Sequence, residues 1–216
     1  LLFVFQQFGT TVVGKTFGPI MIIWFTSISV FGLYHLMSDL TVFRAFNPYY
    51  AWNLLANYKQ GFWILGAVFL CTTGAEAMYS DLGHCGKGNI RVGWGFVKVA
   101  LLLNYFGQAA WLLSLKGQTL NGRIPFYSIV PDSFLIFEIV IATLAAIIAS
   151  QALISGTFTL VNEAMKLKLW PSTLVRHPSQ LKGQIYIPAI NWILLTGTLM
   201  VVFIFGKSEN MEGAYG

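Results

Sequence analysis

The sequence predicts an all-α protein whose helices cross a membrane several times, and three observations lead to that prediction. Hydrophobic residues make up 56% of the 216 residues, charged residues only 10%, and the mean hydropathy is +0.67. A soluble domain carries about a quarter charged residues, so this chain lacks the polar surface that water requires. Apolar stretches of about 20 residues, enough to cross ~30 Å of hydrocarbon, recur along the chain. We therefore expect a polytopic helical bundle and exclude soluble and disordered classes.

The apolar segments are expected to be helices, because backbone groups in hydrocarbon must be hydrogen-bonded within their own segment. Their predicted ranges are 1–8, 17–36, 61–79, 94–115, 134–157 and 185–206, all within one membrane domain. The first range reads as the end of a span, since Leu1 lies inside an apolar run with no Met and no signal pattern before it. We therefore expect the chain to be a piece of a longer protein.

The connections predict two further short helices and one interfacial acid. Asn47-Pro48 opens a predicted interfacial helix over Phe46–Tyr58 on the outer side. The connection Phe158–Trp170 has an amphipathic pattern, and Pro171 would close that helix. Both are expected to be scaffolding. Glu138, near the outer end of its span, is expected to reach the interface.

Lysine and arginine residues in the connections predict the orientation, because cytoplasmic loops carry more of them. One side, made of the connections 9–16, 80–93 and 158–184, carries Lys15, Lys87, Arg91, Lys166, Lys168, Arg176 and Lys182. The other side carries Arg44, Lys59, Lys116, Arg123 and Lys207. We place the richer side in the cytoplasm of a multi-pass cell-membrane protein. The net charge of +5 suits loops facing anionic lipid better than a nucleic-acid surface, so no nucleic-acid partner is expected.

The segment Gly61–Tyr79 has the composition of an interrupted helix that binds an ion. It reads GFWILGAVFLCTTGAEAMY, an apolar half, then Thr72-Thr73-Gly74, and then Glu76. An ionised carboxylate near the bilayer centre costs about 2.5–3.5 kcal/mol even on the mildest scale, so an acid there points to function. Gly74 permits the helix to open, and the threonine hydroxyls can join freed carbonyls in replacing a cation's water. The alternative is that Glu76 lies near the cytoplasmic end and faces a water-filled vestibule.

Other polar residues within the spans are candidates for the ion pathway or for helix packing. Asn104 and Gln108 lie four residues apart on one helical face, where amides serve as interhelical contacts or as pore ligands. Ser150 and Ser155 lie among small residues at four-residue spacing, a pattern typical of close helix contact. Tyr79, at the end of its span, is a further pathway candidate. Packing is the commoner role for the amides and the serines.

The sequence motifs give little reason to expect an enzyme or a metal-binding protein. Gly83–Gly88 resembles a phosphate loop, but no Ser or Thr follows Lys87 as that motif requires. Cys71 and Cys85 form no disulfide framework, and His84 with Cys85 supplies too few ligands for zinc. We expect no catalytic residues, no resident cofactor and no metal beyond the transported ion.

Several sequence blocks together resemble the KUP/HAK/KT potassium-uptake transporters. The blocks, which lie in the family's order over nearly the whole chain, are FGPIMIIWF (Phe17–Phe25), NPYYAWNLL (Asn47–Leu55), TGAEAMYSDLGH (Thr73–His84), LLLNYFGQAAWLL (Leu101–Leu113), IIASQALISGTFTL (Ile147–Leu160) and GQIYIPAINW (Gly183–Trp192). The resemblance implies the fold of amino acid–polyamine–organocation transporters, two inverted five-helix repeats whose first helices are broken at the ion site. In that scheme the chain runs from the end of helix four through helix nine, so the fold is incomplete, and Gly61–Tyr79 is the broken sixth helix.

The resemblance implies potassium uptake, commonly as potassium–proton symport, with the lipid bilayer as surroundings. Thr73 and Glu76 are the ion-site positions that it transfers, and Glu76 is the acid best placed to carry a proton. Since the family's first and third helices are missing, this piece alone is not expected to transport. The alternatives are an organic-solute carrier of the same superfamily and a membrane receptor or interaction subunit that moves nothing. A homodimer stays open.

Overall fold

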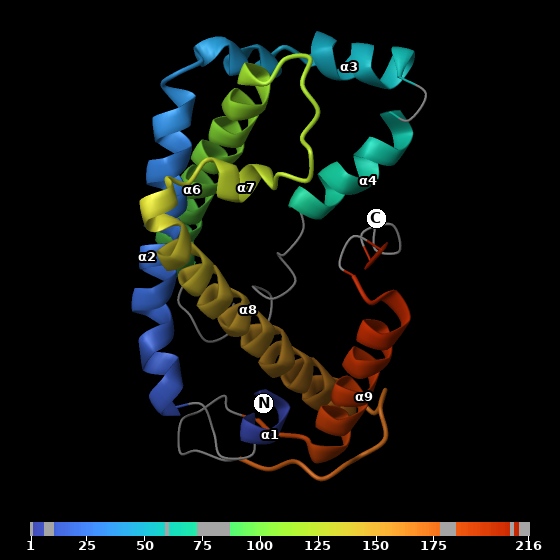
Figure 1. Ribbon diagram of the computed structural model, residues 1–216. Coiled ribbons are helices and arrows are strands. Elements are labelled where there is room, and N and C mark those ends of the chain that lie inside the picture. Colours follow the sequence, from blue (N-terminus) through green and yellow to red (C-terminus); the bar gives the residue numbers. More distant parts are fainter. Residues whose placement is uncertain are drawn as a thin grey trace. The chain divides into compact units, whose positions relative to one another are not determined.

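The computed structural model describes residues 2–6, 11–58, 61–72, 87–177, 185–207 and 210–211. Within these residues the chain is helical apart from its connections (Figure 1). An isolated antiparallel β-bridge pairs Arg176 with Tyr186. The helices are, in chain order, α1 (Leu2–Phe5), α2 (Thr11–Leu36), the 3-10 helix η2 (Leu40–Phe46), α3 (Pro48–Asn57), α4 (Gly61–Thr72), α6 (Lys87–Ser114), α7 (Pro125–Ser128), α8 (Asp132–Lys166) and α9 (Pro188–Phe205).

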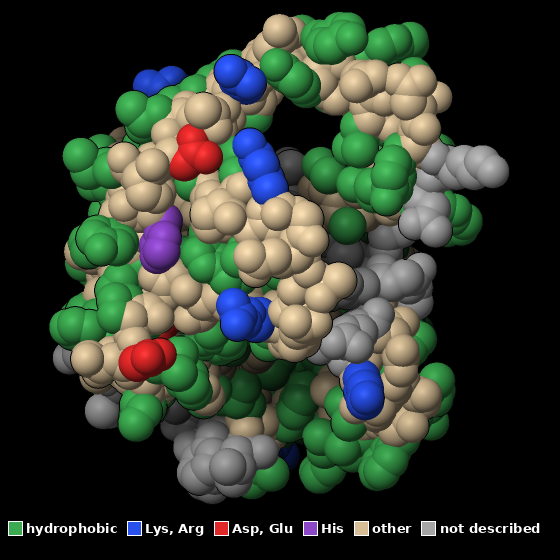
Figure 2. All heavy atoms as spheres, turned by 45° about the horizontal axis from the view of Figure 1, so that its top comes forward, with side chains coloured by type: hydrophobic (Ala, Val, Ile, Leu, Met, Phe, Trp, Pro, Cys, Tyr) green, Lys and Arg blue, Asp and Glu red, His purple; other side chains and the backbone are tan. Residues whose placement is uncertain are grey.

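Four of these helices are long and apolar enough to cross a membrane. They are Thr16–Leu36 within α2, the whole of α6, the whole of α8 and the whole of α9. Large apolar side chains on them point outward, for example Ile136, which is 78% exposed, and Phe203, which is 84% exposed. Figure 2 shows such hydrophobic side chains spread over the visible face, with few charged groups among them. Lipid is the surrounding that accommodates this surface, and the predicted all-α, multi-pass class is confirmed.

Two of the spanning helices are longer than the apolar stretches indicated. Helix α6 begins at Lys87, seven residues before the predicted Trp94. Helix α8 runs without interruption through Lys166. The separate amphipathic helix expected over Phe158–Trp170 is therefore wrong, because no Gly or Pro interrupts the chain between Thr157 and Lys166 and the helix simply continues.

The short outer helix appears where the sequence predicted it. Helix α3 begins at Pro48, whose fixed φ suits a first helical position, and the Asn47 side chain accepts a 3.0 Å hydrogen bond from the Tyr49 N–H. Before it, the Asp39 side chain caps η2 by accepting bonds from the backbone N–H and the hydroxyl of Thr41.

The helices divide into two compact units. Unit 1 comprises Leu1–Lys15, Leu55–Gly86 and Ala149–Gly216, and unit 2 comprises Thr16–Leu54 and Lys87–Ile148. Helix α8 contributes its first half to unit 2 and its second half to unit 1.

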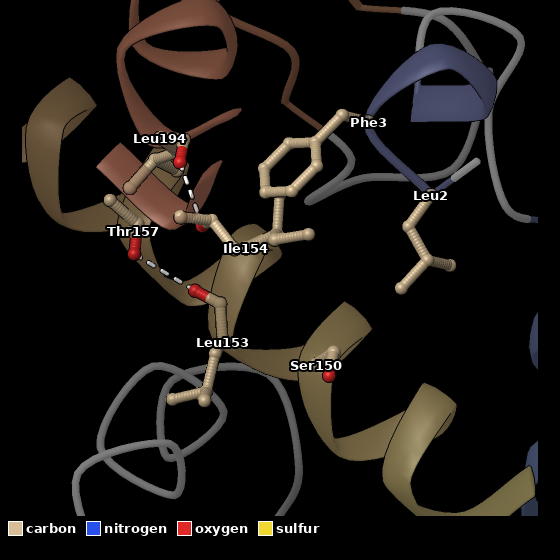
Figure 3. A pocket seen from close by; sticks show the side chains of 8 residues that line it. Leu2, Phe3, Ser150, Leu153, Ile154, Thr157 and Leu194 are labelled. Atoms are coloured by element: carbon tan, nitrogen blue, oxygen red, sulfur yellow. Dashed lines mark hydrogen bonds between the residues drawn. The ribbon is translucent and has the colours of Figure 1, made fainter. Parts of the chain in front are cut away.

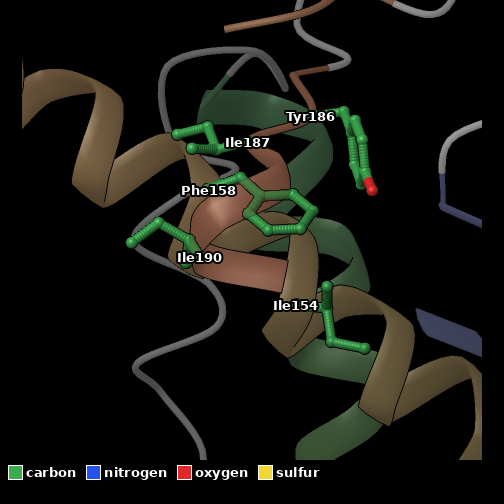
Figure 4. Close-up of a cluster of buried hydrophobic side chains, with 5 residues drawn as sticks. All are labelled: Ile154, Phe158, Tyr186, Ile187 and Ile190. Atoms are coloured by element: carbon green, nitrogen blue, oxygen red, sulfur yellow. The ribbon is translucent and has the colours of Figure 1, made fainter. Parts of the chain in front are cut away.

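Unit 1 has an apolar core where α8 meets the start of α9. The buried side chains come from the second half of α8, from the two residues before α9 and from the first turn of α9, and they are Ile154, Phe158, Tyr186, Ile187 and Ile190 (Figure 4). Phe158 and Tyr186 pack edge to face, with their ring centroids 5.9 Å apart. This core sets the position of the polar residues of unit 1.

Unit 2 is held by α2, α6, α7 and the first half of α8. Aromatic pairs join them, including Phe31 with Phe134 and Trp24 with Phe126. Phe106 of α6 packs against the two phenylalanines of η2, Phe43 and Phe46. These contacts hold α2 against α7 and α8, and η2 against α6.

Candidate functional site

The predicted centre of the site lies at the edge of what the structure describes. Helix α4 includes Thr72 as its last described residue. Thr73, Gly74, Glu76 and Tyr79 lie outside the described residues. The interrupted helix and its ion ligands therefore stay predictions, and the geometry below concerns the other polar residues.

Asn104 lies on the face of α6 that carries its smallest residues. The buried residues of this helix are Ala100, Asn104, Gly107 and Ala110, three or four positions apart. Asn104 is 5% exposed, and its carbonyl oxygen Oδ1 has no hydrogen-bond partner. Gln108 is half-buried beside this face. Of the two predicted amides, Asn104 is thus the one enclosed by protein.

Helices α2 and α6 touch backbone to backbone beside Asn104. A Cβ atom placed on Gly32 would lie 2.5 Å from the carbonyl oxygen of Leu103 and 2.7 Å from the Cα of Asn104. A Cβ on Gly107 would lie 2.5 Å from the Cα of Gly32. Real Cβ atoms do not approach that closely, so glycine is required on both helices. The crossing fixes the depth at which Asn104 is held.

Unit 1 contains a pair of buried glutamines that join α8 to the residue after α1. The Gln6 Nε2 donates to Oε1 of Gln151, and the Gln151 Nε2 donates to Oε1 of Gln6 at 3.1 Å and to the Ser155 hydroxyl at 3.2 Å. Both glutamines are buried, at 6% and 4% exposed. Because each amide oxygen already accepts a bond from its partner, the pair acts as an interhelical contact rather than as a set of cation ligands.

A second polar contact joins α9 to α1. The Asn191 side chain is 2% exposed, and its Nδ2 donates a 3.0 Å hydrogen bond to the carbonyl of Phe3. Its Oδ1 is buried without a partner. Asn191 thus satisfies a carbonyl of the short α1, which has few hydrogen bonds of its own.

Ser150 lines a cavity of about 330 Å³ between α1, α8 and α9 in unit 1. The lining is mainly apolar and consists of Leu2, Phe3, Ser150, Leu153, Ile154, Thr157, Leu194 and Thr198 (Figure 3). The Thr157 hydroxyl donates to the carbonyl of Leu153, four residues earlier, and the Thr198 hydroxyl donates to that of Leu194. Among the described residues that line it, the cavity has no carboxylate to offset the charge of a dehydrated cation.

Glu138 is fully buried, and the expectation that it reaches the interface is wrong. It is 0% exposed, and its Oε1 lies 3.2 Å from the hydroxyl of Ser27 on α2. Its other oxygen, Oε2, has no partner. The side chain turns toward α2 because the face of α8 that carries Glu138 also carries the buried Ile141 and Ala145, three and seven positions on.

The described candidates for the ion pathway fall in different units. Asn104 and Gln108 belong to unit 2, and Ser150 and Ser155 belong to unit 1. Among the described residues, no group of His, Cys, Asp and Glu is placed to hold a metal ion. Lys98, a cation within the α6 span, lies 5.2 Å from the ring centroid of Trp94, a cation–π contact one turn away.

Sequence reasoning missed Gln6, Gln151, Glu138 and Asn191 as buried polar contacts. A polar side chain inside an otherwise apolar segment was the available signal, and all four residues have it. It could not identify partners, since Gln6 and Gln151 are 145 positions apart.

The chain matches known proteins from end to end. The family described as "K+ potassium transporter integral membrane domain" matches residues 1–216. A "Probable potassium transport system protein Kup" of Cytophaga hutchinsonii is 58% identical over 100% of this chain and 34% of its own length. The protein of the same name in Flavobacterium psychrophilum is 56% identical, again over 100% of this chain and 34% of its own length. A "Putative potassium transport system protein Kup 1" of Lactococcus lactis is 54% identical over 100% of this chain and 32% of that protein.

The chain spans about a third of the length of these curated relatives. No solved structure matches the chain.

Proposed function

Because this chain belongs to the K+ potassium transporter family, matched over residues 1–216, we propose that its full-length protein takes up potassium ions across the cell membrane. The end-to-end match is the observation that carries the proposal, together with relatives whose names describe potassium transport systems. The inward drive is available, since the membrane potential contributes about 2.3 kcal/mol per charge for each 100 mV. The four apolar helices are long enough to cross the lipid bilayer, which is the barrier that the potassium ion must pass.

The proposed ion site is an opening of the helix that continues from α4. There, carbonyl oxygens freed around Gly74, with the hydroxyls of Thr72 and Thr73, replace the water around a potassium ion. Glu76 offsets the charge of the ion or takes up a proton in alternation with it, which makes the transport potassium–proton symport. Both units then belong to one membrane domain of the inverted-repeat type, completed by helices outside this chain.

Asn104, Gln108, Ser150, Ser155 and Tyr79 take secondary roles in the proposal. Asn104 keeps a buried oxygen without a partner, so of the two predicted amides of α6 it is the one prepared to accept a hydrogen bond or a cation. Ser155 accepts from Gln151, and we assign it to helix packing. No resident cofactor is required.

The first test removes the acid in the full-length protein. We predict that Glu76→Gln abolishes rubidium uptake or removes its dependence on external pH, because the amide can neither offset a charge nor carry a proton. The readouts are growth of a potassium-uptake-deficient host on limiting potassium and uptake of rubidium. Glu163→Gln is the matched control, since Glu163 is exposed and paired with Lys166 at 2.6 Å. Unchanged uptake with an unchanged pH profile in Glu76→Gln would reject the role of Glu76.

The second test removes one oxygen ligand and keeps the shape of the side chain. We predict that Thr73→Val raises the half-saturation concentration for rubidium at least about fivefold, the factor that ~1 kcal/mol represents. Thr159→Val is the control, because the Thr159 hydroxyl bonds the Ser155 carbonyl of its own helix. Equal half-saturation in Thr73→Val and the parent would count against the ligand role. Failure of the unmodified full-length protein to rescue growth would overturn potassium uptake itself.

A further inference from the structure

A membrane-spanning acid outside the proposed ion site is buried against a hydroxyl that already has another acceptor. Glu138 of α8 is 0% exposed and faces Ser27 of α2, both within unit 2. The Ser27 hydroxyl lies 2.9 Å from the carbonyl of Trp24 in its own helix and 3.2 Å from Oε1 of Glu138. A serine hydroxyl has a single hydrogen, so it can donate fully to one of these two oxygens.

The shorter contact decides where that hydrogen goes. The Trp24 carbonyl and an ionised Glu138 could both only accept, so we assign the Ser27 hydrogen to the nearer of the two, the Trp24 oxygen at 2.9 Å. The Ser27 oxygen then presents lone pairs to Glu138. If Glu138 were ionised, its lone pairs would face those of the Ser27 oxygen and repel them. A protonated Glu138 would instead donate a hydrogen bond to the Ser27 oxygen.

The surroundings of Glu138 favour the neutral form as well. The ion pair found among the described residues joins Lys166 to Glu163. None of the described cations therefore pairs with Glu138. Other charged and histidine side chains are described on the unit 2 helices. His35 bonds the Ile129 carbonyl and Lys98 lies over the Trp94 ring. The structure shows no hydrogen bond or ion pair between Glu138 and the remaining described ones, which are Arg44, Lys87, Arg91 and Asp132. Its second oxygen has no partner at all. An unpaired carboxylate in such a place costs several kcal/mol, which a bound proton removes.

We propose that the Glu138 carboxyl is protonated and donates a hydrogen bond to the oxygen of Ser27. The two residues then form a membrane-buried proton site between α2 and α8. The hydrogen bonds then run in one direction, from the Glu138 carboxyl to the Ser27 oxygen and from the Ser27 hydroxyl to the Trp24 carbonyl. Glu138 is a positioning residue that holds α8 against α2, and its proton remains bound. The site is independent of Glu76 and of the proposed transport, because the carboxyl state can be measured in a protein that moves no ion.

The test is infrared spectroscopy of the full-length protein in lipid vesicles at neutral pH. The difference spectrum between the parent and Glu138→Gln is expected to show the loss of one protonated-carboxyl C=O band, with no loss in the carboxylate bands. Glu163→Gln, the exposed and ion-paired control, is expected to lose intensity in the carboxylate bands only. Loss of carboxylate intensity in Glu138→Gln would overturn the proposal.

Ser27→Ala keeps the acid and removes its acceptor, so it provides a second readout if Glu138→Gln fails to fold. The protonated-carboxyl band is expected to shift to higher frequency in Ser27→Ala, because its hydrogen bond is lost. A band at the parent position would show that Glu138 does not donate to Ser27. The pH profile of rubidium uptake is expected to be the same in Glu138→Gln and the parent, and a changed profile would overturn the claim that the proton stays bound.

Discussion

Buried polar side chains in this chain differ in how completely they are bonded. Gln6 and Gln151 satisfy each other's amides, and in membranes such a hydrogen bond contributes about 0.6 kcal/mol. Asn104, Glu138 and Asn191 each keep one buried oxygen without a partner. Since a buried unpaired acceptor is costly, these three are the described positions where a proton or a further hydrogen-bond donor would stabilise the protein.

The cap of η2 leads to a prediction about pH. The side-chain hydrogen bond from Thr41 to Asp39, at 2.6 Å, and the backbone bond, at 2.9 Å, hold the pKa of Asp39 below its usual value. Because the folded pKa is depressed, the cap stabilises η2 above the unfolded pKa of ~3.9 and weakens as pH falls through the folded pKa. We predict that Thr41→Val raises the pKa of Asp39 while the backbone bond remains.

The measurement is an NMR titration of the Asp39 carboxyl carbon in the full-length protein in detergent micelles. Thr119→Val is a matched control, since its hydroxyl bonds Asn121 and not Asp39. An identical pKa of Asp39 in the parent and in Thr41→Val would show that the hydroxyl bond is not the main cause of the shift.

At the scale of elements, the glycine crossing between α2 and α6 supports the sharpest structural prediction. Gly32→Ala or Gly107→Ala would push the two backbones apart, because the new methyl group would lie within 2.5–2.7 Å of backbone atoms of the other helix. Overpacking of this kind costs ~1–3 kcal/mol, so we predict a lower unfolding temperature for both variants of the full-length protein in detergent.

The same two helices provide the controls. Gly18 lies in α2 and Gly95 in α6, and a Cβ on either would meet no atom within 4 Å. Gly18→Ala and Gly95→Ala are expected to leave the unfolding temperature unchanged or slightly raised, since alanine favours a helix. Equal effects in all four variants would mean that helix propensity, and not the close crossing, determines the result.

The helices could be predicted from the sequence, and their contacts only in part. Hydropathy located the four spanning helices, because each needs ~20 apolar residues, but it placed the start of α6 and the end of α8 too far inward. Helix continues through Lys87–Gly93 in spite of its two glycines, and through Phe158–Lys166, which has no Gly or Pro, although both stretches carry charged and polar residues. The close crossing was missed because Gly32 has its partner far away in the sequence, and spacing within one helix reveals only one side of a contact.

The candidate site was predictable to a different extent. The ion-site roles of Thr73 and Glu76 rest on the chemistry of their side chains and stay predictions, since both residues lie outside the described part of the chain. The burial of Glu138 was not predictable, because its distance from the helix start indicated the interface, whereas the packing of α8 against α2 turns it inward. Direction around a helix depends on the neighbouring helix, which a single sequence does not specify.

At the scale of the whole molecule, α8 is the helix from which we infer the side of the membrane on which each connection lies. Its 35 residues extend about 52 Å, well beyond the ~30 Å hydrocarbon core, so we expect the connections at its two ends to lie on opposite sides. The connection before it carries Lys116 and Arg123, and the connection after it carries Lys168 and Arg176, next to Lys166 at the helix end. The slight excess of positive charge predicts that the second connection lies in the cytoplasm.

We therefore predict that Gln118→Cys reacts with a membrane-impermeant maleimide on intact cells, whereas Ser172→Cys reacts only after permeabilisation. Both positions are exposed in their connections, so access depends on the side of the membrane and not on burial. The background is the full-length protein with Cys71, Cys85 and any other native cysteine replaced by serine, and this cysteine-free protein is the blank. Labelling of both positions on intact cells would mean that α8 does not cross the membrane. The reverse pattern would invert every connection at once, and would place the proposed proton site of Glu138 near the cytoplasmic side.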